Sequence, residues 1–254
     1  RLDYLPLDLG DAGAVERGIA ALLSRHGRLD GLLHAAGETR DALIPRKSLA
    51  DADAVLAPKV RGSWHLDQAT RGIALDWFAL CSSMTSAYGN PGQADYAAAN
   101  GFMDAFAQYR EALRVAGERH GRTRSLLWPL WREGGMQVDA DTQRAMTAAS
   151  GMVPLETASA MRAFHHVLAG EEACVIVVEG DATRLRQALR GRTAPPRTVV
   201  APAAAGPAAS VAATSPDVEG DARLVEHARR YLIAEFAGLM GMPEHEVDAR
   251  APLE

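Results

Sequence analysis

A serine, a tyrosine and an asparagine are spaced so that they could act together on a carbonyl group. Ser83 ends the run LCSS at 80–83, and thirteen residues later Tyr96 opens the run YAAAN, which ends at Asn100. Because Tyr96 and Asn100 are four residues apart, they share one face if this run is helical. A serine hydroxyl and a phenol that converge on one oxygen could polarise a carbonyl and hand it a proton. The spacing therefore indicates acid catalysis at a carbonyl.

A phenol needs a nearby cation for this role, because its ordinary pKa of about 10 makes it a poor acid near neutrality. Lys59, in the run APKVRG at 57–62, is the candidate and lies on the preceding predicted helix. An isolated tyrosine or lysine in such places is usually a helix cap or a solvated side chain. The order of strand, loop and helix around the whole set favours the catalytic interpretation.

The elements that must position these residues alternate between helical and strand-like periodicity. Helices are expected over 11–26, with Asp11 as N-cap, and over 51–70 and 95–120. Apolar strands are expected over 29–36, 74–82, 124–129 and 173–179. Short apolar strands separated by long helices predict an α/β fold with a parallel sheet that is covered on both faces. Ligands of such sheets bind at the carboxyl ends of the strands, where Ser83 would lie.

Composition narrows the possible classes. The chain has 254 residues, of which 48% are hydrophobic and 23% charged, as in a globular protein of one large domain, or of one domain plus a fragment. The net charge of −5 and the lack of a basic run argue against a nucleic-acid partner and against a membrane surface. Two isolated cysteines in apolar runs (Cys81 and Cys174), with no visible signal peptide, predict a cytoplasmic location. The eight histidines show no metal-ligand spacing, so no metal is expected.

The composition changes after residue 190. Residues 191–220 contain an Ala/Pro tract without aromatic residues, which predicts an interdomain linker. Apolar residues at steps of three and four then predict an amphipathic helix within 221–254. We expect a second, α-helical module to begin there.

Residues 1–190 resemble the catalytic portion of a ketoreductase domain of a modular polyketide synthase, in the short-chain dehydrogenase/reductase superfamily. Four stretches carry the resemblance: HAAG at 34–37, VLAPKVRG at 55–62, the block from 82 to 100 that contains GNPGQADYAAAN, and WPLW with GGM between 128 and 136. The resemblance implies a Rossmann-like, doubly wound parallel sheet. It also implies four catalytic residues, which are Tyr96, Ser83, Lys59 and Asn100.

The implied reaction is the NADPH-dependent reduction of a β-ketoacyl thioester, held on an acyl carrier protein, to a β-hydroxyacyl thioester during chain elongation. Lys59 would lower the pKa of Tyr96 and bind the nicotinamide ribose, while Asn100 would hold the lysine or a relay water. Further cofactor contacts are implied for Asp8, His34, Ala35, Ala36, Gly37, Trp128, Pro129 and Leu130.

Two positions bear on stereochemistry. Asp41, about 55 residues before the tyrosine, resembles the aspartate of ketoreductases that form a D-configured hydroxyl, and Tyr88 stands where the contrasting type has tryptophan. We therefore expect the D-configured product. The sequence around Asp41 and Tyr96 resembles that of synthases whose acyltransferases act in trans. Residues 134–144, which include Met136, are expected to form a mobile lid over the substrate.

The sequence also predicts what the two ends of the chain are. No GxGxxG turn occurs, so the first strands of the Rossmann sheet are expected to be missing, and the isolated chain is expected neither to fold completely nor to hold NADPH tightly. Residues 221–254 resemble the start of an acyl carrier protein, and the serine that would carry phosphopantetheine is not in this chain. The implied partners are that carrier protein and the other synthase domains.

Two alternatives remain open. The first is a stand-alone short-chain dehydrogenase that acts on a free small molecule, although the linker and the carrier-like helix argue against it. The second is a non-catalytic, reductase-like subdomain, which the absence of a glycine-rich loop upstream of Arg1 would favour.

Overall fold

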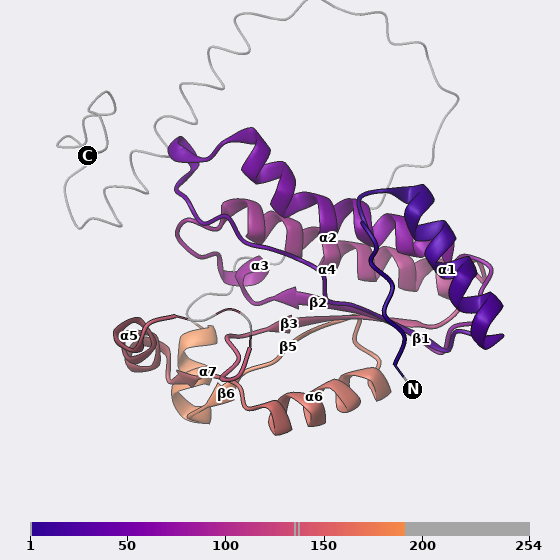
Figure 1. Cartoon of the computed structure of the whole chain (residues 1–254). Coiled ribbons are helices and arrows are strands. Elements are labelled where there is room, and N and C mark those ends of the chain that lie inside the picture. Colours follow the sequence, from indigo (N-terminus) through magenta and orange to yellow (C-terminus); the bar gives the residue numbers. More distant parts are fainter. Residues whose placement is uncertain (1, 135, 137, 191–254) are drawn as a thin grey trace, which may run out of the picture. The chain divides into compact units, whose positions relative to one another are not determined.

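The computed structural model describes residues 2–134, 136 and 138–190 (Figure 1). Its centre is a four-stranded sheet in the order β1-β2-β3-β5. These strands are β1 (Gly31–His34), β2 (Trp77–Ser83), β3 (Arg122–Trp128) and β5 (Cys174–Ile176). Every pairing between them is parallel, so each connection crosses over a face of the sheet. The predicted α/β class with a parallel sheet is confirmed.

Helices cover both faces of the sheet (Figure 1). One face carries α1 (Ala12–His26), α2 (Leu49–Ala69) and α4 (Ala94–Val115), and the opposite face carries α6 (Thr157–Ala169). Successive residues of β2 alternate between two cores, because side chains of a strand point to opposite faces in turn. Phe78 and Leu80 pack into the core beneath α4, and Ala79 packs into the core with α6.

Four shorter helices and a small antiparallel sheet complete the described chain. The helices are η1 (Ile44–Arg46), α3 (Thr85–Tyr88), α5 (Ala140–Ser150) and α7 (Ala182–Arg190). The second sheet pairs β4 (Met152–Val153) with β6 (Glu179–Gly180). None of the described helices is long and apolar enough to cross a membrane.

Several predicted boundaries need correction. Asp11 caps α1 as predicted, since its side chain accepts the N–H of Ala14 at 3.0 Å. The helix predicted over 95–120 ends at Val115, because Gly117 and Gly121 adopt positive φ angles that turn the chain back into β3. The strand predicted over 173–179 is divided into β5 and β6.

Two predictions for the carboxyl-terminal part of the chain have no counterpart among the described residues. The predicted linker at 191–220 and the predicted carrier-like helix at 221–254 both lie outside the described residues. Part of the segment predicted as a lid, residues 140–144, forms the first turns of α5. Asp139 begins this helix by accepting the N–H groups of Asp141 and Thr142.

A buried ion cluster joins the two long helices that lie over the sheet. Asp67 of α2 accepts Arg110 Nε of α4 at 2.8 Å and Arg119 Nε at 2.9 Å. The Arg110 guanidinium also lies 4.4 Å from the centre of the Phe78 ring. Because the Asp67 and Arg110 side chains are both fully buried, this cluster holds α2 and α4 in one fixed register.

Candidate active site

Ser83 and Tyr96 meet at the carboxyl end of β2. Ser83 is the last residue of that strand, and Tyr96 lies in the first turn of α4, after the connection through α3. Both residues are buried. The side chains of Ser83 and Asn100 lie close enough to the phenol of Tyr96 to act on its pKa. The structure therefore brings together three of the four residues that were predicted to be catalytic.

The electrostatic surroundings of Tyr96 differ from the sequence-based expectation. Burial raises the pKa of Tyr96, and the nearby side chains of Asn100 and Ser83 offset only part of that rise. The Asp41 carboxylate adds a further upward effect on the pKa, which shows that Asp41 lies within electrostatic reach of the phenol. Desolvation is thus the largest influence on the pKa of Tyr96 in the described structure, and it opposes the lowering that is expected from Lys59.

Lys59 lies beneath this pair on α2. Its side chain is buried, with Nζ 2.9 Å from the carbonyl oxygen of Cys81 and 3.5 Å from Sδ of Met103. Nζ is 5.7 Å from the centre of the Tyr96 ring, so the ammonium faces the ring. Burial lowers the pKa of Lys59 to about 8. The sequence had indicated the right helix for this lysine.

Asn100 is fully buried one turn after Tyr96. Its Nδ2 donates to the carbonyl oxygen of Tyr96 at 2.7 Å, and its own carbonyl lies 3.3 Å from the Ser82 hydroxyl. Its Oδ1 has no hydrogen-bond partner among the residues that the structure describes. A buried acceptor without a partner calls for a donor from outside, such as a water molecule or a ligand hydroxyl.

The end of β1 forms an open ledge beside Lys59. Ala35, Ala36 and Gly37 follow the strand and are exposed. A Cβ at Gly37 would lie 2.7 Å from Cε of Lys59, so the space next to the lysine exists only because residue 37 lacks a side chain. His34 itself turns inward, with Nε2 3.0 Å from the carbonyl oxygen of Pro58. Burial lowers the pKa of His34 to about 4, so this ring is a neutral link between β1 and α2.

These features fit a nicotinamide ribose. The ammonium of Lys59 offers donors for ribose hydroxyls, Oδ1 of Asn100 awaits a donor, and Gly37 leaves room for a ring at the edge of the sheet. Such a cradle at the carboxyl ends of parallel strands is where nucleotide ligands bind in this fold class.

The remaining predicted cofactor contacts are spread more widely. Trp128 ends β3, is buried in the core with α6, and contacts Trp131 at 5.1 Å between ring centres. Pro129 and Leu130 follow it and line a small apolar hollow beneath α5. Asp8 is exposed and accepts the N–H of Gly10 at 2.8 Å, an arrangement that serves the local turn.

The residues predicted to bear on the substrate lie in three different segments. Gln93 donates to Asp41 at 2.8 Å, which fixes the Asp41 loop beside the segment that leads into α4. Tyr88 ends α3 and is half-buried. Met136 is exposed by 53% and lies before α5.

Sequence reasoning missed two groups beside the site. Lys47 and Asp95 form a buried ion pair directly before Tyr96. Asp104 accepts the hydroxyl of Ser125 at 2.6 Å and that of Ser86 at 2.5 Å. The spacing of eight residues from Tyr96 could have revealed Asp104, because two helical turns return to the same face. No comparable signal was available for Lys47.

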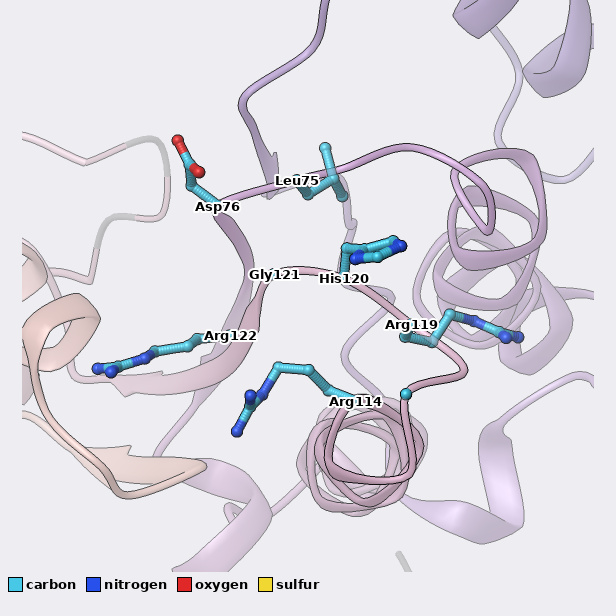
Figure 2. A pocket seen from close by; sticks show the side chains of 8 residues that line it. Leu75, Asp76, Arg114, Arg119, His120, Gly121 and Arg122 are labelled. Carbon is cyan, nitrogen blue, oxygen red and sulfur yellow. The ribbon is translucent and has the colours of Figure 1, made fainter.

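A larger pocket lies at the other end of the strands, where β2 and β3 begin (Figure 2). It measures about 390 Å³ and is lined by Leu75, Asp76, Arg114, Gly117, Arg119, His120, Gly121 and Arg122. Its cations are largely neutralised, since Arg114 pairs with Glu111 and Arg119 pairs with Asp67. The amino ends of parallel strands are not the usual ligand edge, and we assign the chemistry to the carboxyl edge.

The comparisons with known proteins point to one family. The family model described as "KR domain" matches residues 1–133. Polyketide synthase PksN of Bacillus subtilis (strain 168) is 40% identical over 193 residues, which are 76% of this chain and 4% of that protein. Polyketide synthase ThaG of Burkholderia thailandensis is 36% identical over 254 residues, which are 100% of this chain and 4% of that protein.

Solved structures give the same answer. The crystal structure of a ketoreductase domain from the bacillaene assembly line superposes with a TM-score of 0.71 at 42% identity, covering 72% of this chain and 44% of that one. Fold and site define a chain of the short-chain dehydrogenase/reductase type. The chain belongs to the ketoreductase domain family of polyketide synthases. It spans less than half of that solved structure and only a small part of the curated relatives that it matches.

Proposed function

We propose that this chain supplies the catalytic residues for the NADPH-dependent reduction of a β-ketoacyl thioester to a β-hydroxyacyl thioester. The observation that carries the proposal is the convergence of Ser83 and Tyr96 above the buried ammonium of Lys59. NADPH, when bound, supplies the hydride that reduces the ketone carbon. The ledge at Gly37, the donors of Lys59 and the free Oδ1 of Asn100 would hold its ribose.

The chain's own residues would manage the oxygen. Ser83 and Tyr96 donate hydrogen bonds to the ketone oxygen and orient the substrate carbon. As negative charge develops on that oxygen, the Tyr96 O–H bond breaks and its proton moves to the oxygen, which completes the alcohol. The phenolate that remains is stabilised by the Lys59 ammonium, which faces the ring. A water on Oδ1 of Asn100 could return a proton to the phenol.

We propose further details on the strength of the sequence. The acyl chain would be held by the phosphopantetheine of a carrier protein, within a synthase whose acyltransferases act in trans, and the hydroxyl would be D-configured. Residues 191–220 would be a linker, and 221–254 would begin that carrier protein. In support, the alignment with ThaG runs through these residues. Composition supports a cytoplasmic location.

The decisive experiment compares two tyrosines of α4. In the full-length protein that contains this chain, NADPH oxidation is followed with a β-ketoacyl thioester as substrate. Tyr96→Phe should lower kcat by about 10²- to 10⁴-fold, the usual contribution of a positioned acid. The matched control is Tyr109→Phe, because Tyr109 lies on the same helix and is 48% exposed.

Three outcomes separate the possible functions. Loss of turnover in Tyr96→Phe alone supports the proposal. Undiminished turnover in Tyr96→Phe contradicts the assigned proton donor. A wild-type protein that neither binds NADPH nor reduces any thioester would instead favour a non-catalytic reductase-like subdomain.

A further inference from the structure

The loop between β1 and α2 is tied to the segment that leads into Tyr96. Three contacts join residues that are far apart in sequence. Nε2 of Gln93 donates to Asp41 at 2.8 Å, and the N–H of Ala42 donates to the carbonyl of Gly92 at 2.9 Å. The third contact is the ion pair between Lys47 Nζ and Asp95 Oδ2 at 2.7 Å. These contacts hold residues 38–48, which we term the Asp41 loop, against the segment that leads into Tyr96.

The ion pair differs from the other two contacts by its burial. The side chains of Lys47 and Asp95 are only 7% and 5% exposed. Lys47 Nζ also donates to the carbonyl of Arg40, and the second oxygen of Asp95 accepts the N–H of Tyr96 at 2.9 Å. One continuous set of contacts therefore runs from the residue before Asp41 to the backbone of Tyr96.

Burial makes this link specific. A buried ion pair adds little net stability, but removing one partner leaves a charge without compensation in a site that excludes water. The remaining group then moves toward solvent, and the backbone that it holds moves with it. Exposed ion pairs lack this effect because water replaces the missing partner.

We propose that Lys47 and Asp95 are positioning residues that fix the Asp41 loop relative to Tyr96 and thereby determine which face of the ketone is reduced. This inference rests on the proposed function. The substrate ketone must present one face to the hydride while its oxygen contacts Tyr96, so a loop held against the segment before Tyr96 limits its orientation. A shift of about 1 Å in such a loop can change the rate about 100-fold. A looser loop admits the opposite orientation as well.

The experiment uses the full-length protein with NADPH and a β-ketoacyl thioester. Lys47→Met removes the charge and keeps the apolar stem, and Asp95→Asn removes the charge and keeps an acceptor for the N–H of Tyr96. The matched control is Arg61→Met, which breaks an ion pair with Asp53 of the same length, 2.7 Å, on exposed side chains. The readouts are kcat, the ratio of the two hydroxyl epimers, and hydrogen exchange in residues 38–48.

The expected result is a kcat that falls about 10- to 100-fold, a minor epimer that rises severalfold, and faster exchange in the Asp41 loop. Arg61→Met should leave all three unchanged. If the ion pair only stabilised the fold, its removal would lower the unfolding temperature and leave the epimer ratio of the folded protein as in the wild type. Either an unchanged epimer ratio or unchanged exchange would overturn the proposal.

A variant that fails to fold and a wild-type protein without activity give results that differ from a failure of this proposal. If Lys47→Met does not fold, Lys47→Arg and Asp95→Asn decide, and a wild-type ratio in both overturns the proposal. If the wild-type protein reduces no thioester, the proposed function fails and the epimer ratio is lost as a readout. Hydrogen exchange then tests by itself whether the ion pair fixes the Asp41 loop. Exchange in Asp95→Asn that matches the wild type would overturn that part of the proposal.

Discussion

The side chain of Lys59 fills the space that a side chain at residue 37, shortly after β1, would need. A Cβ on residue 37 would lie 2.7 Å from Cε and 3.3 Å from Nζ of Lys59. The lysine cannot easily move aside, because Nζ is hydrogen-bonded to the carbonyl of Cys81. A glycine at the end of one strand is thus required by a lysine that comes from the following helix.

Gly37→Ala should therefore displace the ammonium from beneath Tyr96. We expect kcat/KM for the thioester to fall about 10- to 100-fold, since misplacing a catalytic group by about 1 Å has effects of this size. Gly72→Ala is the matched control, because nothing lies within 4 Å of a Cβ at that position. Equal kinetics for the two variants, measured on folded protein, would show that Lys59 does not need the space at Gly37.

Lys59 should impose an alkaline limit on activity. Burial lowers its pKa to about 8, so raising the pH through that value removes the ammonium that faces Tyr96. We expect kcat/KM, which reports the free enzyme, to decline above about pH 8. In Lys59→Met the residual activity should be low and should lack this limb. An alkaline limb that persists in Lys59→Met would assign it to another group.

The same residues show how far the sequence could lead. The four-residue spacing of Tyr96 and Asn100 fixes their shared face, and the end of an apolar run places Ser83 at the edge of the sheet, so both could be predicted. The link from Lys59 to the carbonyl of Cys81 could not, because it depends on how closely α2 packs against β2.

Long-range pairs were likewise beyond the sequence. Lys47 and Asp95 are 48 residues apart, and no periodic pattern relates a loop to the start of a later helix. The end of α4 was placed five residues too late, because the polar run after Val115 remains compatible with a helix until glycines 117 and 121 adopt positive φ. Local patterns thus predicted the elements, and tertiary contacts decided their limits and their ion pairs.

His34 should make the fold sensitive to acid. Its pKa is lowered from 6.5 to about 4, so the unfolded chain takes up a proton at a higher pH than the folded chain does. Stability is retained above about pH 6.5 and is lost as the pH falls toward 4. Between pH 7 and pH 5 the loss from this group should be about 2 kcal/mol in the free energy of unfolding.

Urea unfolding at pH 7 and pH 5 measures this contribution. His34→Gln keeps a donor for the carbonyl of Pro58 and should lack that part of the pH dependence. His166→Gln, on the exposed side of α6, should behave like the wild type. The same pH dependence in His34→Gln as in the wild type would place the acid-sensitive group elsewhere.

Asp104 should act on the site through its neighbours. Its carboxylate accepts the hydroxyl of Ser125 at 2.6 Å and lies 2.5 Å from Oγ of Ser86, which is itself 2.8 Å from the carbonyl of Ser83. The same negative charge raises the pKa of Lys59 against the effect of burial. Asp104→Asn keeps the size of the side chain but removes the charge, so the pKa of Lys59 should fall further.

The pH profile separates this role from simple structural support. In Asp104→Asn the alkaline limb of kcat/KM should move to lower pH, and kcat/KM at neutral pH should fall about tenfold as Ser83 loses its support. Glu111→Gln is the control, because Glu111 lies two turns further along α4 and pairs with Arg114 instead of the site. That variant should lose stability and keep the wild-type pH profile. An unmoved alkaline limb in Asp104→Asn would mean that the carboxylate supports only the packing of α3 and β3 against α4.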